Sequence, residues 1–91
     1  MEGHLEHQVT EISQTPGVVG VICTDPQGLS LAARGTLKPE SSGLVSGLAT
    51  QAASLNLGNG EDDKPTIVVE FDTGNILIRG QQNSTLGIHK V

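Results

Sequence analysis

The sequence contains almost no aromatic residues and few basic ones. It has one Phe, no Trp and no Tyr, so it lacks the aromatic platforms on which single-stranded nucleic acids stack. Its five Lys and Arg residues are scattered through a chain of net charge −5, whereas binding to a phosphate backbone needs clustered positive charge. These two deficits argue against a nucleic-acid partner.

Cysteine and long apolar runs are also scarce. The single cysteine, Cys23, excludes an internal disulfide framework and fits a reducing compartment. No apolar run approaches the ~18 residues of a membrane span, and the acidic, polar N-terminus is unlike a secretory leader. We therefore expect a cytoplasmic chain without direct membrane insertion, which reaches any membrane only through a partner.

The length and composition predict one small domain over residues 1–91. Hydrophobic residues make up 35% of the chain, so the core must be built from Val, Ile, Leu and Ala. Such a core leaves little surplus stability in a domain of this size. We expect the chain to gain part of its stability by pairing with another subunit.

The stretch at residues 16–37 predicts a strand hairpin around which the rest is organised. Residues 18–24 form a β-branched, apolar run, and residues 29–34 form a second, thinner strand. Residues 25–28, Asp-Pro-Gln-Gly, have the composition of a tight turn. In the second strand Leu29 and Leu31 alternate with small residues, so the face opposite the leucines is expected to be less buried.

Two helices are predicted beside this hairpin. The first covers residues 2–14, with Leu5, Val9 and Ile12 in one apolar stripe, and it ends before Pro16. The second is opened by Pro39 and reaches about Asn56. Its predicted apolar arc consists of Leu44, Val45, Leu48, Ala49, Ala52 and Leu55.

Three further strands follow a polar, Gly-rich loop at residues 57–65. They cover residues 66–71, 76–79 and 84–91. The short connections between them imply antiparallel hairpins. The order α-β-β-α-β-β-β predicts an α+β fold, with one antiparallel sheet and helices on its faces.

No motif for catalysis, cofactor binding or a metal site stands out. His4 and His7 share a helical spacing that suits a metal, but only His89 and Cys23 could complete the ligand set, and solvated histidines are the simpler interpretation. Cys23 lies in an apolar strand, where a buried and inert thiol is expected. We therefore expect a protein that is not an enzyme and holds no cofactor.

Two surface features point to pairing with another protein. The run at residues 66–71, TIVVEF, has little charge and would be a sticky edge strand unless a partner strand covers it. Gly43 and Gly47 lie four apart on the flank of the second helix. Either these glycines are surface residues without a particular role, or they allow another backbone to approach the helix closely.

Three segments together resemble a known family. They are VGVICTDPQGLSLAARGTL at residues 19–37, GLVSGLATQAASL at 43–55 and DTGNILIRGQQNSTLGIHKV at 72–91. They are similar to the hepatitis B virus X-interacting proteins, the family of the fifth late endosomal/lysosomal adaptor subunit of the Ragulator complex. The resemblance extends over essentially the whole chain, with departures at Pro39, Gly47 and the glycines of residues 58–60.

The resemblance implies a roadblock/longin-type domain with a five-stranded antiparallel sheet and one helix on each face. In that family the third strand and the second helix form the dimer contact, which corresponds here to residues 66–71 and 39–55. The predicted interface residues are Gly43, Gly47, Leu48, Gln51, Thr66, Ile67, Val68, Val69 and Glu70. Gly47→Glu, or Val68→Pro at the strand edge, is expected to break pairing.

The resemblance also implies the biological setting. It points to a non-enzymatic scaffold that heterodimerises with another roadblock-type Ragulator subunit and contacts the lipidated subunit that holds the assembly on lysosomes. The assembly recruits Rag GTPases for amino-acid activation of TOR signalling. Two alternatives are an independent cytosolic binding module, which includes apoptosis-related or viral-protein binding, and a small enzyme or GTPase regulator with a catalytic residue of its own.

Overall fold

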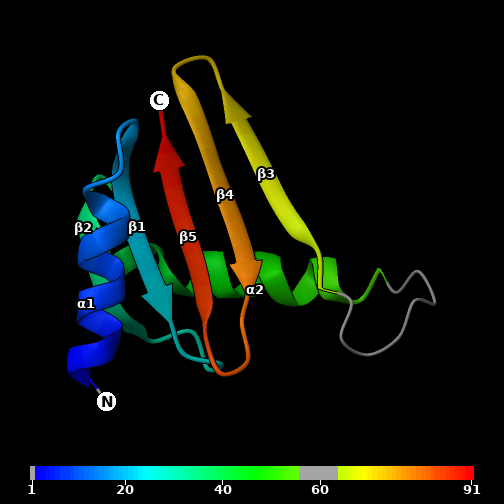
Figure 1. The fold of residues 1–91 in the computed structure, drawn as a ribbon. Helices are drawn as coiled ribbons and strands as arrows, with labels where there is room; N and C mark the ends of the chain where they lie inside the picture. The colour runs from blue at the N-terminus through cyan, green and yellow to red at the C-terminus, as the bar shows by residue number, and fades with distance from the viewer. Residues whose placement is uncertain (1, 56–63) are drawn as a thin grey trace.

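The computed structural model describes residues 2–55 and 64–91, with the side chains of residues 2–4 left aside. Most of the predicted Gly-rich loop, and the side chain of His4, therefore lie outside the described part. The helices are α1 (Glu2–Ser13) and α2 (Ser42–Ala53), the latter preceded by a 3-10 turn at Pro39–Ser41. The strands are β1 (Val18–Thr24), β2 (Ser30–Gly35), β3 (Thr66–Phe71), β4 (Gly74–Gly80) and β5 (Thr85–Lys90) (Figure 1).

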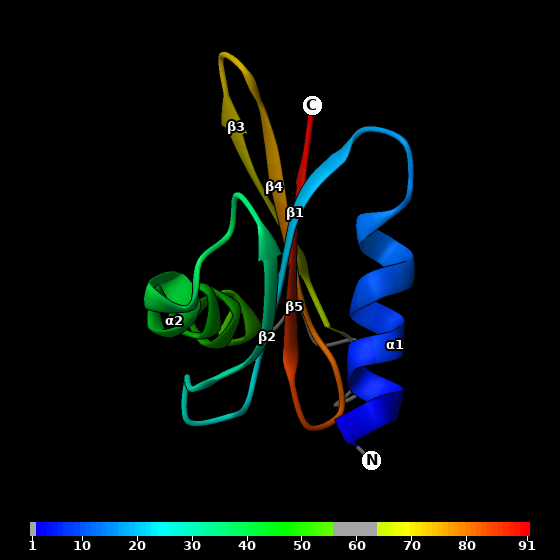
Figure 2. The same ribbon diagram turned by 90° about the vertical axis from the view of Figure 1, so that its left-hand side faces the viewer.

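The strands form one antiparallel sheet in the order β2-β1-β5-β4-β3. The two helices cover opposite faces of this sheet (Figure 2). This confirms the predicted α+β class, the order of the elements and the placement of a helix on each face. β4 is longer than the predicted 76–79, because pairing with β3 continues down to a two-residue turn at Asp72 and Thr73.

The core has two parts, one on each face of the sheet. Under α1, the fully buried Val9 packs with Val21 and Cys23, and Leu5 and Ile12 complete the predicted stripe. Under α2, the buried residues are Ile22, Leu37, Val45 and Ile78. Because β1 contributes alternate residues to both clusters, it is buried on both faces, as its β-branched run predicted.

The predicted turn between β1 and β2 is confirmed by its hydrogen bonds. The backbone N–H of Gly28 donates to the carbonyl of Asp25 over 3.0 Å. The Oδ1 atom of Asp25 accepts from the N–H groups of Gln27 and Leu29, at 3.0 and 2.8 Å. The Ser42 hydroxyl then donates to the carbonyl of Gly28 over 2.7 Å and so fixes the start of α2 beside this turn.

The expected burial pattern of β2 is wrong. Leu29 and Leu31 are exposed, whereas Ala32 packs toward α1 and Ala33 toward α2. Cys23 pairs with Ala32 and Thr24 with Ser30, so Leu31 is the extra residue of a β-bulge. α1 contacts the strand that carries the alanines, and the small side chain of Ala32 allows that close approach.

The predicted apolar arc of α2 is only partly buried, and the helix ends at Ala53 rather than near Asn56. The side that contacts the sheet is centred on Val45, while Leu44 and Leu55 are 70% and 74% exposed. The apolar stripe is therefore wider than the contact that the sheet provides. The exposed part of the stripe lies on one flank of the helix.

Candidate protein-interaction surface

Two features of the described residues bear on the chemistry considered above, the grouping of possible metal ligands and the surroundings of Cys23. The described residues contain no group of three or more His, Cys, Asp or Glu side chains arranged to hold a metal ion. Cys23 is only 1% exposed, and burial raises the pKa of its thiol above the usual 9.0, an effect that a hydrogen bond with the Ser84 side chain offsets only in part. This thiol therefore stays protonated and shielded, as the sequence predicted for a structural cysteine.

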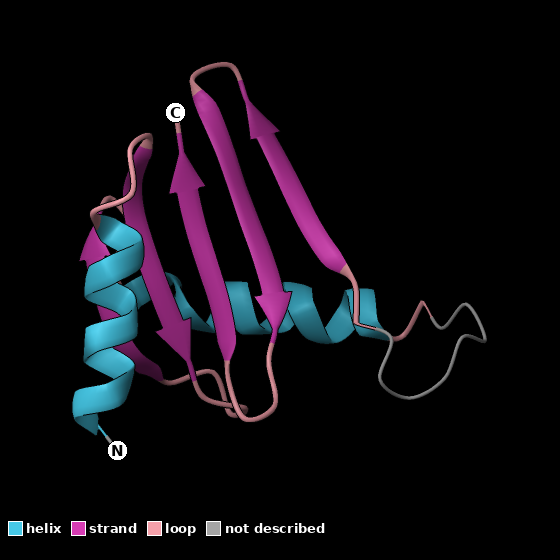
Figure 3. Ribbon diagram, viewed as in Figure 1, coloured by secondary structure: helices cyan, strands magenta, loops and turns pink. Residues whose placement is uncertain are grey.

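The two flanks of α2 face opposite ends of the sheet. Ser46, Thr50 and Ala53 lie beside the β4–β5 turn. At 100° per residue, Leu44, Leu48 and Leu55 fall on the opposite flank, toward the β3–β4 turn. In Figure 3, α2 passes behind the lower part of the sheet, and the upper ends of β3 and β4 extend beyond it.

These uncovered strand ends are apolar. Ile67 and Ile76 pack against the core under α2, so Val69 and Phe71 share that face by strand alternation. Phe71 is 55% exposed. Leu48 of α2 packs on the same cluster, so the leucine flank of α2 and the end of the β3–β4 hairpin lie on the same face of the sheet.

β3 is an edge strand, as predicted. It pairs with β4 along its whole length and stands last in the sheet order. Thr66 receives a hydrogen bond from Arg79 over 2.7 Å, whereas Val68 is 51% exposed. An edge with one charged residue, Glu70, has little protection against pairing with another strand.

The predicted glycines are open to solvent. A Cβ atom built at Gly43 or Gly47 would meet nothing within 4 Å. Gly47 lies on the outward rim of the leucine flank, but Gly43 lies at the N-terminal end of α2, close beside Gly28 of the β1–β2 turn. Of the predicted helix residues, Leu48 packs against the same cluster as Ile67 of β3, and Gly43 lies apart at the start of α2.

The predicted set also omitted three exposed apolar residues of this region: Leu44, Leu55 and Phe71. The leucines were visible in the sequence as part of the helical arc, but the arc alone does not say which part the sheet covers. We define the α2–β3 surface by the flank residues of α2 and the strand β3. Its members are Leu44, Gly47, Leu48, Gln51, Leu55, Thr66, Ile67, Val68, Val69, Glu70 and Phe71.

A second apolar row lies on the other face of the sheet. Val68 pairs with Leu77, and Leu77 pairs with Ile88, so the three side chains form one row across β3, β4 and β5. Among the described residues α1 packs mainly on β1 and β2, and Figure 1 shows it at their side of the sheet, away from β3 and β4. This row is separate from the leucine flank of α2.

None of the described helices combines the length and apolarity needed to cross a membrane.

Comparison with known proteins places this chain in a family. The sequence model described as "Ragulator complex protein LAMTOR5" matches residues 1–90. The chain is 44% identical over 91 residues to a "Ragulator complex protein LAMTOR5 homolog" of Nematostella vectensis, covering 100% of this chain and 98% of the relative. It is 37% identical over 91 residues to the "Ragulator complex protein LAMTOR5" of Xenopus tropicalis, with the same coverage.

Solved structures agree on the fold. "MglB with tetrameric arrangement" superposes with a TM-score of 0.77 at 18% identity, over 98% of this chain and 71% of that chain. "Crystal Structure of Roadblock/LC7 Domain from Streptomyces avermitilis" superposes with a TM-score of 0.70 at 21% identity, over 87% and 70% of the two chains. The full-length sequence matches and the shared roadblock architecture lead to one conclusion: this chain belongs to the Ragulator complex protein LAMTOR5 family.

Proposed function

We propose that this chain is a non-enzymatic scaffold subunit that heterodimerises through the α2–β3 surface with another roadblock-type Ragulator subunit. The observation that carries the proposal is the coincidence of an unprotected edge strand with an open apolar region beside it. Either feature alone is common on protein surfaces. Together they involve β3 and α2, the two elements through which a second domain of the same fold could pair with this one.

The geometry suggests how the pair forms. A partner β3 strand adds to the β3 edge, which continues the sheet into the second subunit and satisfies the free backbone groups. The partner's α2 helix then lies over the uncovered ends of β3 and β4, against Leu44, Leu48 and Phe71. In this arrangement an approximate two-fold axis relates the two subunits. The α2 helix of this chain therefore covers the equivalent region of the partner.

Gly47 contributes by its lack of a side chain. It lies on the outward rim of the leucine flank, where a neighbouring helix can approach without meeting a Cβ atom. Gly43 is assigned only a peripheral part, because it lies beside the β1–β2 turn.

The wider role follows from family membership and is part of the same proposal. The pair contacts the lipidated Ragulator subunit and thereby resides on the cytosolic face of lysosomes and late endosomes, with a cytoplasmic pool. Through the assembly it helps to recruit Rag GTPases in amino-acid activation of TOR signalling. The row Val68, Leu77 and Ile88 supports a contact with a third subunit, because it remains open on the other face of the sheet after pairing.

Light scattering of the purified chain, alone and mixed with a candidate sister roadblock subunit, tests the pairing. We expect the separate species to merge into a one-to-one heterodimer. Phe71→Lys should weaken this heterodimer at least tenfold, because pairing would bury an uncompensated charge. The matched control is Gln14→Lys, which adds the same charge beyond the end of α1.

The alternative outcomes are distinct. A stable homodimer that ignores the sister subunit would replace the heterodimer proposal with an independent binding module. Undiminished pairing of the Phe71→Lys variant would show that the interface lies elsewhere.

A further inference from the structure

The buried polar side chains gather at one end of the sheet, on the face covered by α2. Four polar side chains are buried among the described residues, and all of them carry hydroxyl groups. They are Thr24, Ser42, Ser46 and Thr85. Thr24 pairs with Thr85 across β1 and β5, and the two serines lie in the first half of α2. A concentration of hydroxyls in a core made otherwise of aliphatic residues needs an explanation.

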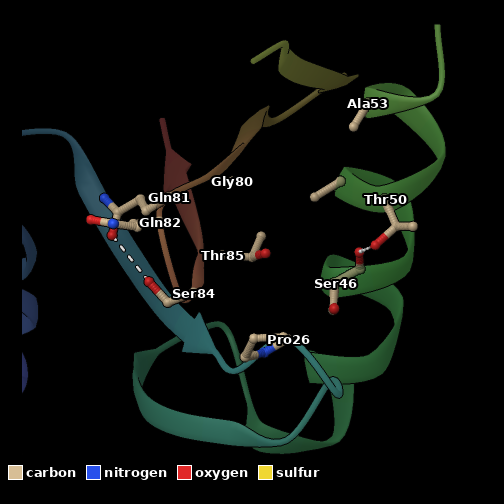
Figure 4. A pocket seen from close by; sticks show the side chains of 10 residues that line it. Pro26, Ser46, Thr50, Ala53, Gly80, Gln81, Gln82, Ser84 and Thr85 are labelled. Carbon is tan, nitrogen blue, oxygen red and sulfur yellow. Dashed lines mark hydrogen bonds between the residues drawn. The ribbon is translucent and has the colours of Figure 1, made fainter. Parts of the chain in front are cut away.

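A groove opens at this place, on the flank of α2 opposite the leucines. It has a volume of about 210 Å³ and is lined by α2, by the β4–β5 turn and by Pro26 of the β1–β2 turn. Figure 4 shows the side chains of Ser46 and Thr85 in the space between the helix and β5, with the glutamines of the turn on the far side. None of its lining residues is ionisable.

The hydrogen bonds of the groove leave some hydroxyls free. The Thr50 hydroxyl donates to the carbonyl of Ser46 over 3.1 Å, and the Ser84 hydroxyl donates to Oε1 of Gln81 over 3.2 Å. By contrast, the hydroxyls of Ser46 and Thr85 form no hydrogen bond with another described residue, and both remain accessible from the groove although their residues are only 7% and 8% exposed. Behind them, the Thr24 hydroxyl is fully buried and has no partner in the described part of the chain.

We propose that this groove is a binding site for a short, uncharged, extended peptide segment of a partner protein, which places a neutral hydrogen-bonding group against Ser46 and Thr85. The absence of ionisable residues from the lining disfavours a charged ligand, since burial of an unpaired charge is costly. The free hydroxyls favour a carboxamide or a peptide group, which can both donate and accept.

The length of the groove suits a short extended peptide. From Ser46 to Ala53 the helix rises by about 10 Å, which matches about three residues of extended chain. Ala49, Ala53 and Gly80 line the same groove, and their small side chains leave its wall open to a peptide backbone.

The site is independent of the pairing proposed above, because it lies on the other flank of α2. An amide NMR titration of the full chain with three capped tripeptides, Ala-Asn-Ala, Ala-Asp-Ala and Ala-Leu-Ala, tests it. The central residues are nearly isosteric, so the series separates neutral hydrogen bonding from charge and from apolar contact. We expect the Asn peptide to shift the signals of Gly80, Gln81 and Thr85 and to bind about fivefold more tightly than the other two.

Two variants remove the hydroxyls while keeping the shape of the groove: Ser46→Ala and Thr85→Val. Each variant should bind the Asn peptide only as tightly as the unchanged chain binds the Leu peptide. If either variant fails to fold, Ala53→Leu blocks the groove from its exposed rim, and Leu44→Gln on the opposite flank is the matched control. Equal or tighter binding of the Asp or Leu peptide, or no shift with any peptide, would overturn the proposal.

Discussion

The Oγ1 atom of Thr36 lies 2.6 Å from the Nδ1 atom of His89. This hydrogen bond joins the segment that follows β2 to the central strand β5, although the two residues are 53 positions apart in the sequence. The Thr36 side chain reaches His89 by passing over Gly20 of β1, where a Cβ atom would collide with Oγ1. The contact therefore ties one edge of the sheet to its centre.

Removal of this hydrogen bond should destabilise the fold modestly. Thr36→Val keeps the shape of the side chain but leaves His89 without its partner, and we expect the free energy of unfolding to fall by about 1 kcal/mol. Urea denaturation measures the change. Thr36→Ser retains the hydroxyl and should lose less than Thr36→Val, and the reverse order would contradict the assigned role.

Substitution of Gly20 should cost more. In Gly20→Ala the added methyl would meet the Thr36 hydroxyl and would lie 2.9 Å from the backbone nitrogen of Leu37. We expect a loss of about 2–3 kcal/mol, because an overpacked site must shift its backbone. The double variant with Thr36→Ala should recover only part of this loss, since the Leu37 backbone remains; full recovery would assign the strain to Thr36 alone.

Gly47 should separate the stability of the chain from its pairing. No atom blocks a side chain at this position in the described residues, so Gly47→Ala should stabilise the isolated chain by up to about 1 kcal/mol through helix propensity. Gly47→Glu should leave the isolated chain folded but abolish binding to the sister subunit in a pull-down. Circular dichroism checks the fold, and loss of both fold and binding would refute this separation.

Stability should fall at alkaline pH through Cys23. Burial raises the pKa of this thiol in the folded chain, so the unfolded state releases its proton first. The free energy of unfolding therefore keeps its full value below the thiol's usual pKa of 9.0 and falls as the pH rises above it. Urea midpoints at increasing pH measure the decline, and Cys23→Ala should show a weaker dependence over the same range; an identical dependence would exclude Cys23 as its origin.

The elements and their order could be predicted from the sequence, because each rests on local patterns. The β-branched run of β1, the Asp25 turn and the stripe of Leu5, Val9 and Ile12 are encoded within a few residues of one another. The bulge at Leu31 was not predictable in this way. It depends on how β2 pairs with β1 while both helices pack nearby, so the exposed leucines contradicted a simple alternation.

The candidate surface was predictable in outline. A weakly charged strand predicted the edge at β3, and the sheet order confirms that position. The rotation of α2 about its own axis was not encoded as clearly, because the leucine and valine positions form one broad arc. Only the packed structure distinguishes Val45, which faces the core, from Leu44, which remains exposed.

The position of β5 in the sheet has a consequence for folding kinetics. The hairpins β1–β2 and β3–β4 are local, but within the described sheet they are joined through β5, which pairs with both. Pairings such as Val18 with Lys90 close nearly the whole chain into one loop, and such distant contacts slow folding. Until β5 inserts, each hairpin exposes a second unpaired edge. We therefore expect refolding to become less efficient at high protein concentration, with half-formed sheets joining one another before the central strand separates them.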